Sequence, residues 1–196
     1  AEISKKININ KVTVCATKDD NKQVVQNSSD EINRLLKTNI RIHYQSISDI
    51  WRPKKICKFD CAIVCVPDHH HFEISRFLME NGIHTQIVKP LTPNVKQAQD
   101  LIKIQLEKNV YACVEFHKRF DESNLVIKKI IDDGDLGEIS YFSVHYSQRK
   151  EIPLNLFRNW ASKTNVFQYL GVHYVDLIYF LTRYKPERVM AIGKKE

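Results

Sequence analysis

The stretch DCAIVCVPDHHHFEISRFLMENGIHTQIVKP, residues 60–90, decides the fold expected for this chain. Residues 60–66 form a short apolar run that predicts a buried strand. Residues 71–81 then carry apolar side chains at helical spacing, and Gly82 provides a C-cap. The inward-facing positions of this helix are Phe72, Ile74, Phe77 and Leu78. Residues 84–88 predict a second strand, so the stretch indicates a strand–helix–strand unit with parallel strands.

The same alternation continues on both sides of this unit. Further strands are predicted at residues 11–15, 40–44 and 110–116, and further helices at residues 30–38, 48–51 and 94–108. The apolar face of the first of these helices is formed by Ile32, Leu35 and Leu36. Strands that alternate with helices indicate a parallel sheet with helices on its faces. Ligands bind such sheets at the carboxyl ends of the strands, which here are residues 16–18, 67–71, 89–90 and 115–119.

The pattern changes after Gly137, and the change indicates a second domain. The elements predicted in this part are a helix over residues 122–132, a strand over 139–148, a helix over 166–181 and a strand over 188–192. The first of these strands alternates in polarity, which is typical of antiparallel sheets. We therefore place a boundary near residue 120, which divides the chain into α/β domains at residues 1–120 and 121–196.

Composition bounds the class of protein. The chain has 196 residues, of which 43 % are apolar and 27 % charged, as in ordinary globular domains. No apolar run approaches the ~20 residues that cross a bilayer, and no secretory signal opens the chain, so we expect a cytoplasmic protein away from membranes. The net charge of +7 comes from scattered lysines. This favours a solvated basic surface over a nucleic-acid site, with an anionic cofactor or nucleotide sugar as the other reading.

The five cysteines indicate reduced thiols. They are Cys15, Cys57, Cys61, Cys65 and Cys113. An odd count without a secretory signal argues against disulfides. Cys61 and Cys65 belong to the strand predicted at residues 60–66, so we expect core cysteines rather than zinc ligands. The run His69–His71 is not expected to bind metal either, because adjacent histidines cannot easily converge on one ion.

Five short motifs follow one another along the chain. They are Val66-Pro67-Asp68-His69-His70-His71, Val88-Lys89-Pro90-Leu91, Phe116-His117-Lys118-Arg119-Phe120-Asp121, Gly134-Asp135-Leu136-Gly137-Glu138-Ile139 and Leu170-Gly171-Val172-His173. In this order and at these spacings the set resembles the Gfo/Idh/MocA oxidoreductases. The resemblance implies a Rossmann domain that binds NAD or NADP. It also implies a following α/β domain whose open, mainly antiparallel sheet carries the substrate and often forms oligomers.

The glycine-rich turn that grips a dinucleotide pyrophosphate does not occur in these 196 residues, which contain five glycines. In the family this turn belongs to the first strand and helix. We therefore expect an incomplete Rossmann domain in a chain cut at both ends, with weak cofactor binding by this piece alone.

The resemblance points to Lys89 and His173 as catalytic residues. Lys89 precedes a proline at a strand's carboxyl end, where its ammonium could orient a substrate hydroxyl near the nicotinamide. The alternative is an ordinary loop lysine. His173 is cast as the general acid/base, which suits an imidazole near neutral pH. The alternative is a core histidine packed beside Tyr174 and Leu177.

Two positions depart from the family pattern. Tyr169 stands where the family usually has Asp, four residues before His173, so a phenol replaces the carboxylate that would orient the imidazole and bind substrate. Val88 replaces the Glu of the Glu-Lys-Pro loop. Either the substrate differs from the usual polyols, or catalysis is weakened or lost. Tyr169 is still counted with the catalytic and substrate-binding candidates.

The cofactor candidates follow from the strand ends. Thr17 and Lys18 stand where an acidic residue would bind the ribose of NAD, and Asp19 comes later. They could instead receive a 2′-phosphate, so NADP is slightly preferred. The remaining cofactor candidates are Val66, Pro67, His71, Lys89 and Pro90.

Two softer candidates for substrate binding are Arg119 and Trp160. Arg119 could pack at the domain junction or bind an anionic group of the substrate. Trp160 could line a sugar-binding face or belong to the core.

The function expected from these residues is hydride transfer between a nicotinamide and a sugar, nucleotide sugar or cyclitol, in a homo-oligomer. The rival is a Rossmann-type nucleotide- or sugar-binding regulatory protein that has lost turnover. Tyr169 and Val88 favour the rival, whereas Lys89 and His173 argue against it. Nucleic-acid binding is a third and weaker reading, because the basic residues form no stripe.

Overall fold

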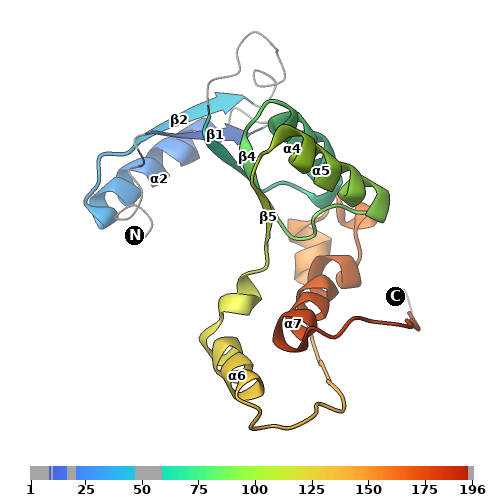
Figure 1. The fold of residues 1–196 in the computed structure, drawn as a ribbon. Helices are drawn as coiled ribbons and strands as arrows, with labels where there is room; N and C mark the ends of the chain where they lie inside the picture. The colour runs from blue at the N-terminus through green and yellow to red at the C-terminus, as the bar shows by residue number, and fades with distance from the viewer. Residues whose placement is uncertain (1–8, 10, 17–20, 47–58, 194–196) are drawn as a thin grey trace. The chain divides into compact units, whose positions relative to one another are not determined.

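The computed structural model describes residues 9, 11–16, 21–46 and 59–193. The helix predicted over residues 48–51, Cys57, and the cofactor candidates Thr17 and Lys18 lie outside the described residues. Two compact units result, Ala1–Phe59 and Asp60–Glu196, each with its own parallel sheet (Figure 1). The boundary predicted near residue 120 lies inside the second unit and stays a prediction.

The first unit is one strand–helix–strand element. Strands β1 (Lys11–Ala16) and β2 (Arg41–Ser46) pair in parallel, and helix α2 (Asn21–Leu36) packs against β2. Asn33 fixes the turn between α2 and β2, because its side chain donates to the Ile40 carbonyl at 3.0 Å and accepts from the Ile40 amide at 2.9 Å. The parallel arrangement predicted for this part of the chain is confirmed.

Helix α2 differs from its prediction in its length and in which side chains face inward. It begins at Asn21 rather than at Asp30, because its polar first half carries no apolar period to reveal it. Ile32 and Leu35, predicted to face inward, are exposed, and among the side chains of α2 that the structure describes Ser29 is buried. The side chain of Leu36, also predicted to face inward, is not among those described. A two-stranded sheet offers little surface against which a helix can bury side chains, so the apolar period alone does not fix the facing.

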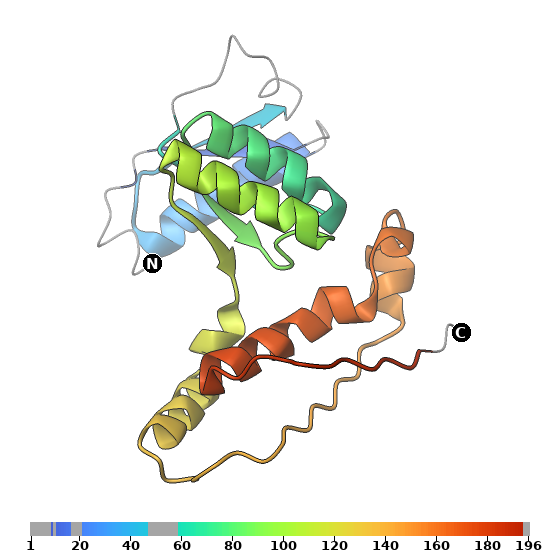
Figure 2. The same cartoon turned by 45° about the vertical axis from the view of Figure 1, so that its right-hand side comes forward.

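The second unit begins with a three-stranded parallel sheet in the order β3–β4–β5. Its elements are β3 (Cys61–Val64), α4 (His71–Glu80), β4 (His84–Val88), α5 (Val95–Lys108) and β5 (Ala112–Glu115). Helices α4 and α5 lie side by side over the sheet in both ribbon views (Figures 1 and 2). Asn94 caps α5 by accepting from the Gln97 amide at 3.0 Å. Asn109, with a φ of 51°, ends this helix.

The core of the second unit lies between this sheet and its two helices. Its buried apolar residues there are Val64, Leu78, Met79, Ile83, Ile87, Leu101 and Val110. The buried stripe of α4 consists of His71, Ser75, Leu78 and Met79. The prediction was right for Leu78 and wrong in the rotation of the helix, since Phe72, Ile74 and Phe77 are half-buried. Two polar residues, His71 and Ser75, take the innermost places, which hydrophobic periodicity cannot reveal.

Strand β3 is covered on one face by the described residues. Val64 is buried toward α4, whereas Cys61, Ile63 and Cys65 on the other face are exposed. The prediction that Cys61 and Cys65 are core residues is therefore wrong. Alternate residues of a strand point to opposite faces, and an apolar run does not tell which face is covered. The described cysteines, Cys15, Cys61, Cys65 and Cys113, form no disulfide with one another.

The remainder of the second unit is mainly helical. Its elements are the 3₁₀ turn η2 (His117–Phe120), α6 (Glu122–Asp132), the π-helical turn η3 (Ile152–Leu156), the 3₁₀ turn η4 (Ala161–Lys163), the π-helical turn η5 (Phe167–Gly171) and α7 (Val172–Thr182). Helix α7 packs against α6 and η2. The helix predicted over residues 166–181 is confirmed as η5 followed by α7. Its first turn is a wider π turn, a feature that often occurs at functional sites.

The antiparallel sheet predicted for this part is not confirmed. Residues 139–149 and 184–193 form no ladder with any described residue. Tyr141 and Val189 are among their exposed side chains. A strand exists only when a neighbouring chain segment pairs with it, and alternating polarity cannot supply that neighbour.

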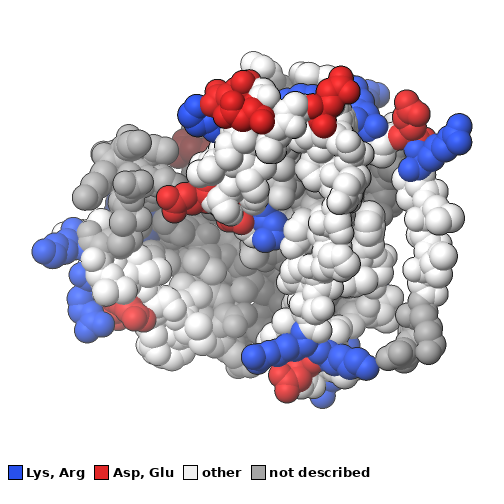
Figure 3. Space-filling model, turned by 90° about the horizontal axis from the view of Figure 1, so that it is seen from below, with Lys and Arg blue, Asp and Glu red and all other residues white. Residues whose placement is uncertain are grey.

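The described surface carries charges of both signs. On the face drawn in Figure 3, most groups of Lys and Arg atoms have Asp or Glu atoms beside them. In the part of the chain that the structure describes, each helix is too short or too polar to cross a membrane.

Candidate functional site

The carboxyl ends of β4 and β5 bring three charged or titratable side chains to one edge of the sheet. In the ladder between these strands Val88 pairs with Glu115. Lys89 follows Val88 directly, and His117 lies two residues beyond Glu115 in η2. Parallel strands place their carboxyl ends at the same edge, so Lys89, Glu115 and His117 share it. We call these three residues the sheet side of the site.

His71 fixes the loop that carries Lys89. The side chain is 0 % exposed, and its two ring nitrogens lie 2.7 Å from the Pro90 carbonyl oxygen and 2.9 Å from the Val66 carbonyl oxygen. The ring thus ties the loop after β3 to the loop after β4, where the Lys89–Pro90 peptide bond is cis. Among the predicted cofactor residues, His71 therefore acts on the shape of the loops, because both ring nitrogens are already engaged.

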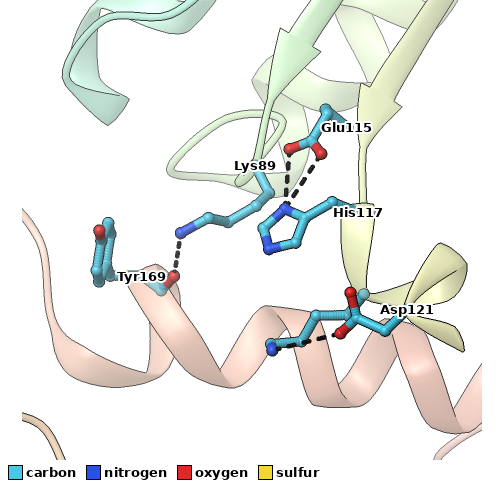
Figure 4. Close-up of polar contacts among 6 residues, drawn as sticks. Lys89, Glu115, His117, Asp121 and Tyr169 are labelled. Atoms are coloured by element: carbon cyan, nitrogen blue, oxygen red, sulfur yellow. Dashed lines mark hydrogen bonds and ion pairs between the residues drawn. The ribbon is translucent and has the colours of Figure 1, made fainter. Parts of the chain in front are cut away.

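The second wall of the site comes from η5 and α7. Tyr169 lies in η5, and His173 is the second residue of α7. We call these two residues the helix side. Lys89 connects the two sides, since its Nζ donates to the Tyr169 carbonyl at 2.5 Å and lies 3.7 Å from the centre of the Tyr169 ring (Figure 4). An ammonium over an aromatic face is a favourable cation–π contact.

The pKa values of Lys89 and Tyr169 both shift toward the neutral form. Burial lowers the pKa of the Lys89 ammonium, although the carboxylates of Asp68 and Glu115 act in the opposite direction. Burial likewise raises the pKa of the Tyr169 phenol. Tyr169 therefore offers a neutral hydroxyl and an aromatic face where the family usually has a carboxylate.

His173 is a buried histidine without a hydrogen bond at Nδ1. Its side chain is 3 % exposed, and within the described residues Nδ1 has no partner. Burial, and after it the Lys89 ammonium, lowers the pKa of His173 to about 4; His117 and Lys118 add to the shift and Glu115 opposes it. The ring is consequently neutral at pH 7. The sequence placed Tyr169 one α-helical turn before His173, where the family usually has an orienting carboxylate, but the π turn η5 breaks this one-turn alignment.

Glu115 and His117 form a carboxylate–imidazole pair that sequence reasoning did not single out. The His117 Nδ1 lies 3.1 Å and 3.2 Å from the two carboxylate oxygens of Glu115 (Figure 4). The His117 ring also lies edge-on to His173, with 4.6 Å between ring centroids. The signal that could have revealed the pair is the position of both residues at a strand's carboxyl end.

Asp68 is a second residue that sequence reasoning missed. It begins the 3₁₀ turn η1 (Asp68–His70), which follows β3, and is 3 % exposed. Its Oδ2 accepts from the Thr164 hydroxyl at 2.8 Å and from the Gln168 amide at 3.2 Å. A buried carboxylate thus joins the sheet to the segment that leads into η5. The partners lie about a hundred positions away in sequence, so no local pattern shows them.

Arg119 and Trp160 occupy different places around this site. Arg119 donates through Nε and Nη2 to both carboxylate oxygens of Asp176, with Nε 2.7 Å from Oδ2, and so joins η2 to α7. This hydrogen bond, above all, raises the pKa of Arg119. Trp160 packs beside Phe157 at 4.5 Å and near Tyr169 at 6.4 Å between ring centroids. Arg119 is thus engaged in an ion pair, and Trp160 belongs to an aromatic cluster next to Lys89.

Two family models cover most of the chain. Residues 4–116 match the model described as "Oxidoreductase family, NAD-binding Rossmann fold", and residues 125–196 match the Gfo/Idh/MocA C-terminal domain. The chain belongs to the Gfo/Idh/MocA oxidoreductase family. The resemblance inferred from the five motifs is therefore confirmed.

Relatives within the Gfo/Idh/MocA family act on cyclitols. The NADP-dependent scyllo-inositol 2-dehydrogenase of Bacillus subtilis is 29 % identical over 118 residues, which are 60 % of this chain and 33 % of that protein. The structure of myo-inositol 2-dehydrogenase from Lactobacillus plantarum superposes with a TM-score of 0.64 at 22 % identity, covering 88 % of this chain and 48 % of that one. An inositol dehydrogenase homologue from Azotobacter vinelandii, solved with NAD⁺, gives a TM-score of 0.55 at 24 % identity, covering 69 % and 37 %. The chain spans about a third of the length of the curated relatives it matches.

The residues of the sheet and helix sides fit the nicotinamide cofactor that the family model implies. The site lies at the carboxyl ends of parallel strands, where such sheets bind their ligands. Two buried ring nitrogens, Nδ1 of His69 and Nδ1 of His173, have no partner within the described residues and could bind a polar ligand. The other described cofactor candidates, Val66, Pro67, Lys89 and Pro90, belong to the segments that follow β3 and β4. In the described residues no three His, Cys, Asp or Glu side chains lie close enough to hold a metal ion.

Proposed function

We propose that this chain is part of an NAD(P)-dependent dehydrogenase that transfers hydride between a nicotinamide and a carbon bearing a hydroxyl or keto group. The substrate class is a sugar, nucleotide sugar or cyclitol. The observation that carries the proposal is the partly desolvated ammonium of Lys89 at a strand's carboxyl end beside the neutral, buried ring of His173. The cyclitol dehydrogenases among the relatives support the substrate class.

Each residue of the site has a separate role toward the substrate oxygen. A bound oxidised nicotinamide supplies a ring carbon that accepts hydrogen from the substrate carbon together with its electron pair. Lys89 holds the substrate oxygen by a charge-assisted hydrogen bond and stabilises negative charge that develops on it. Tyr169 aims the Lys89 ammonium through its carbonyl oxygen and ring face. His173 presents a neutral imidazole that hydrogen-bonds the same oxygen and takes part in its proton transfer.

The aromatic cluster is the proposed surface for the substrate ring. Phe157, Trp160 and Tyr169 lie within 4.5 to 6.4 Å of one another, measured between ring centroids, and Tyr169 also holds Lys89. Aromatic faces bury the apolar face of a sugar or cyclitol ring while its hydroxyls stay available for hydrogen bonds. Arg119 is proposed to hold the junction between η2 and α7, since Asp176 already occupies two of its donors.

Several finer features remain proposals of the same kind. We propose NADP over NAD on the basis of Thr17 and Lys18. A division near residue 120 is supported by the ends of the two family matches, residues 4–116 and 125–196. We also propose that the protein is cytoplasmic and forms a homo-oligomer.

The rival function is a regulatory protein that binds a nucleotide or a sugar without turnover. Val88 and Tyr169, which replace the two expected carboxylates, favour it. The contact between Lys89 and Tyr169 and the position of His173 favour the enzyme, because a binding protein has no need to desolvate a lysine.

The experiment that decides between them uses the full-length polypeptide. Fluorescence titration with NADPH and NADH measures binding, and turnover is measured with myo-inositol, scyllo-inositol and D-glucosides. We expect NADPH binding together with turnover that collapses in Lys89→Ala and His173→Ala but not in Lys96→Ala, an exposed control on α5. Binding without turnover on any of these substrates would support the regulatory protein, and absence of binding would contradict both.

A further inference from the structure

Asp68 is a buried carboxylate whose two side-chain donors are both neutral. It is 3 % exposed, and it accepts from the Thr164 hydroxyl and the Gln168 side-chain amide. Within the described residues it forms no ion pair. Burial of a carboxylate without a cation in contact costs free energy, which its hydrogen bonds only partly offset. A charge kept in such a place points to a role beyond packing.

Lys89 needs a negative charge that its own neighbours in the motifs do not provide. The family pattern usually has carboxylates where this chain has Val88 and Tyr169. The Lys89 ammonium donates instead to the Tyr169 carbonyl at 2.5 Å. Burial lowers the pKa of Lys89, and the carboxylates that oppose this effect are Asp68 first and Glu115 second. Among the described residues Asp68 is thus the principal negative charge that acts on the ammonium.

The same carboxylate fixes the segment that holds Lys89. Thr164 precedes η5 and Gln168 lies in it, and both donate to Oδ2 of Asp68, at 2.8 Å and 3.2 Å. Asn165 closes the turn between them. Its Oδ1 accepts from the Gln168 backbone amide at 2.8 Å, and its carbonyl accepts from the Tyr169 amide at 2.9 Å. Tyr169 follows Gln168 directly, so the place of its carbonyl oxygen depends on this turn.

We propose that Asp68 is a positioning residue that acts through Lys89. It holds η5 so that the Tyr169 carbonyl meets the Lys89 ammonium, and it supplies the negative charge that Val88 and Tyr169 do not. The inference rests on the proposed function. Asp68 is enclosed, so the substrate oxygen meets Lys89 and not the carboxylate. An ammonium has three donors, of which Tyr169 engages one, so the others remain for the substrate.

The titratable groups around Lys89 come from each element next to it. They are Asp68 from η1, Glu115 from β5, Tyr169 from η5 and His173 from α7. Asp68→Asn keeps the size of the side chain and an acceptor oxygen but removes its charge. Glu115 is then the one carboxylate among these groups, so the pKa of Lys89 falls further and the ammonium loses its proton at lower pH.

The kinetic test compares pH profiles of kcat/KM in the full-length polypeptide. NADP⁺ or NAD⁺ is used with the best of the three substrate types above. We expect Asp68→Asn to lower kcat/KM by about 10- to 10²-fold, mostly in kcat, and to move the alkaline limb of the profile to lower pH. Asp132→Asn, an exposed control on α6, changes neither. An unchanged kcat/KM in Asp68→Asn, or a loss with the alkaline limb in its wild-type place, overturns the proposal.

A pair of variants at Thr164 tests the same contact without removing the buried charge. Thr164→Val keeps the shape and loses the hydroxyl that donates to Asp68. We expect it to lower kcat/KM by about 10-fold with the alkaline limb in place, because the ammonium is misplaced while its counter-charge remains. Thr164→Ser keeps the hydroxyl and should lose much less. Equal losses in the two variants would contradict the role of this hydrogen bond.

A spectroscopic test does not depend on turnover. The pKa of Lys89 is followed through its ¹³Cε shift in ¹³C-lysine-labelled full-length polypeptide, and the signal is assigned by its absence in Lys89→Arg. We expect a lower pKa in Asp68→Asn than in wild type, and no change in Asp132→Asn. Equal values in wild type and Asp68→Asn overturn the inference whatever the enzyme does.

The two tests separate this inference from the proposed function. If the pKa of Lys89 falls in Asp68→Asn but no nucleotide binds and no substrate reacts, the proposed function fails, and the catalytic role of Asp68 fails with it. Turnover that does not respond to Asp68→Asn refutes the inference alone.

Discussion

The sheet side and the helix side of the site contribute opposite physical properties. Lys89, Glu115 and His117 bring charge and proton-exchanging groups to the end of a parallel sheet, where His117 is open to solvent. Tyr169 and His173 bring neutral rings, and the ring of His173 is buried. The comparison teaches that a sequence motif can identify the residues of a site. Their burial in the folded chain then decides which of them can carry charge. Four predictions test this division, from the largest expected effect to the smallest.

The first prediction concerns coupling between the two sides. Lys89→Met and His173→Gln should each lower kcat/KM by about 10²- to 10⁴-fold, because both act on one oxygen in the transition state. The double variant should be little worse than the weaker single variant, since residues that act as a unit are not additive. Steady-state kinetics of the three variants measures this coupling, with Lys96→Met as the control. Full additivity would show that the two sides work independently.

The second prediction tests the neutral state of His173 through stability. The folded pKa of about 4 lies below the ordinary value of 6.5, so the unfolded chain binds more protons between these pH values. The contribution is present above pH 6.5 and is lost as the pH falls toward 4, by up to about 3 kcal/mol. The decrease in unfolding free energy between pH 7.5 and 4.5, measured by urea denaturation, should be smaller in His173→Gln than in wild type. Equal decreases in both, as expected for the control His43→Gln, would mean that His173 is not enclosed as a neutral ring.

The third prediction concerns the ion pair that holds η2 against α7. Asp176→Asn should destabilise α7 by about 2 kcal/mol, because two charge-assisted hydrogen bonds to Arg119 are weakened in a half-buried place. Hydrogen exchange of the α7 amides measures the free energy of local opening. Exchange as slow as in wild type would show that the helix side is held by packing alone.

The smallest effect is expected far from the site. Arg76 and Glu80 form an exposed ion pair on α4, with 2.9 Å between Nε and Oε1. Glu80→Gln should change the unfolding free energy by less than about 0.5 kcal/mol, because water and salt screen an exposed pair. Thermal denaturation at low and high salt measures the effect. A larger loss of unfolding free energy would mean that exposed charges on α4 affect stability as much as the charges of the sheet side do.

The sequence predicted the elements whose information is local. The strand–helix–strand units, the helix expected over residues 94–108, which is α5, and the bounds of α6 were all read from local sequence patterns. Lys89 and His173 came from motifs, and the structure places both around one site. Predictions from periodicity were wrong where the direction in which a side chain faces depends on a neighbour distant in sequence. Cys61 and Cys65 on β3 and Ile32 on α2 are examples.

Some of the site could not be predicted because its partners meet across the fold. Asp68 meets Thr164 and Gln168, and Glu115 comes level with Val88 only through the ladder of β4 and β5. The sequence by itself determined a parallel α/β chain of the Gfo/Idh/MocA family, since its strands, helices and motifs are local patterns. Only the tertiary structure decided that His173 is enclosed and His117 open, because solvent exposure and the electric field at a side chain are set by residues distant in sequence.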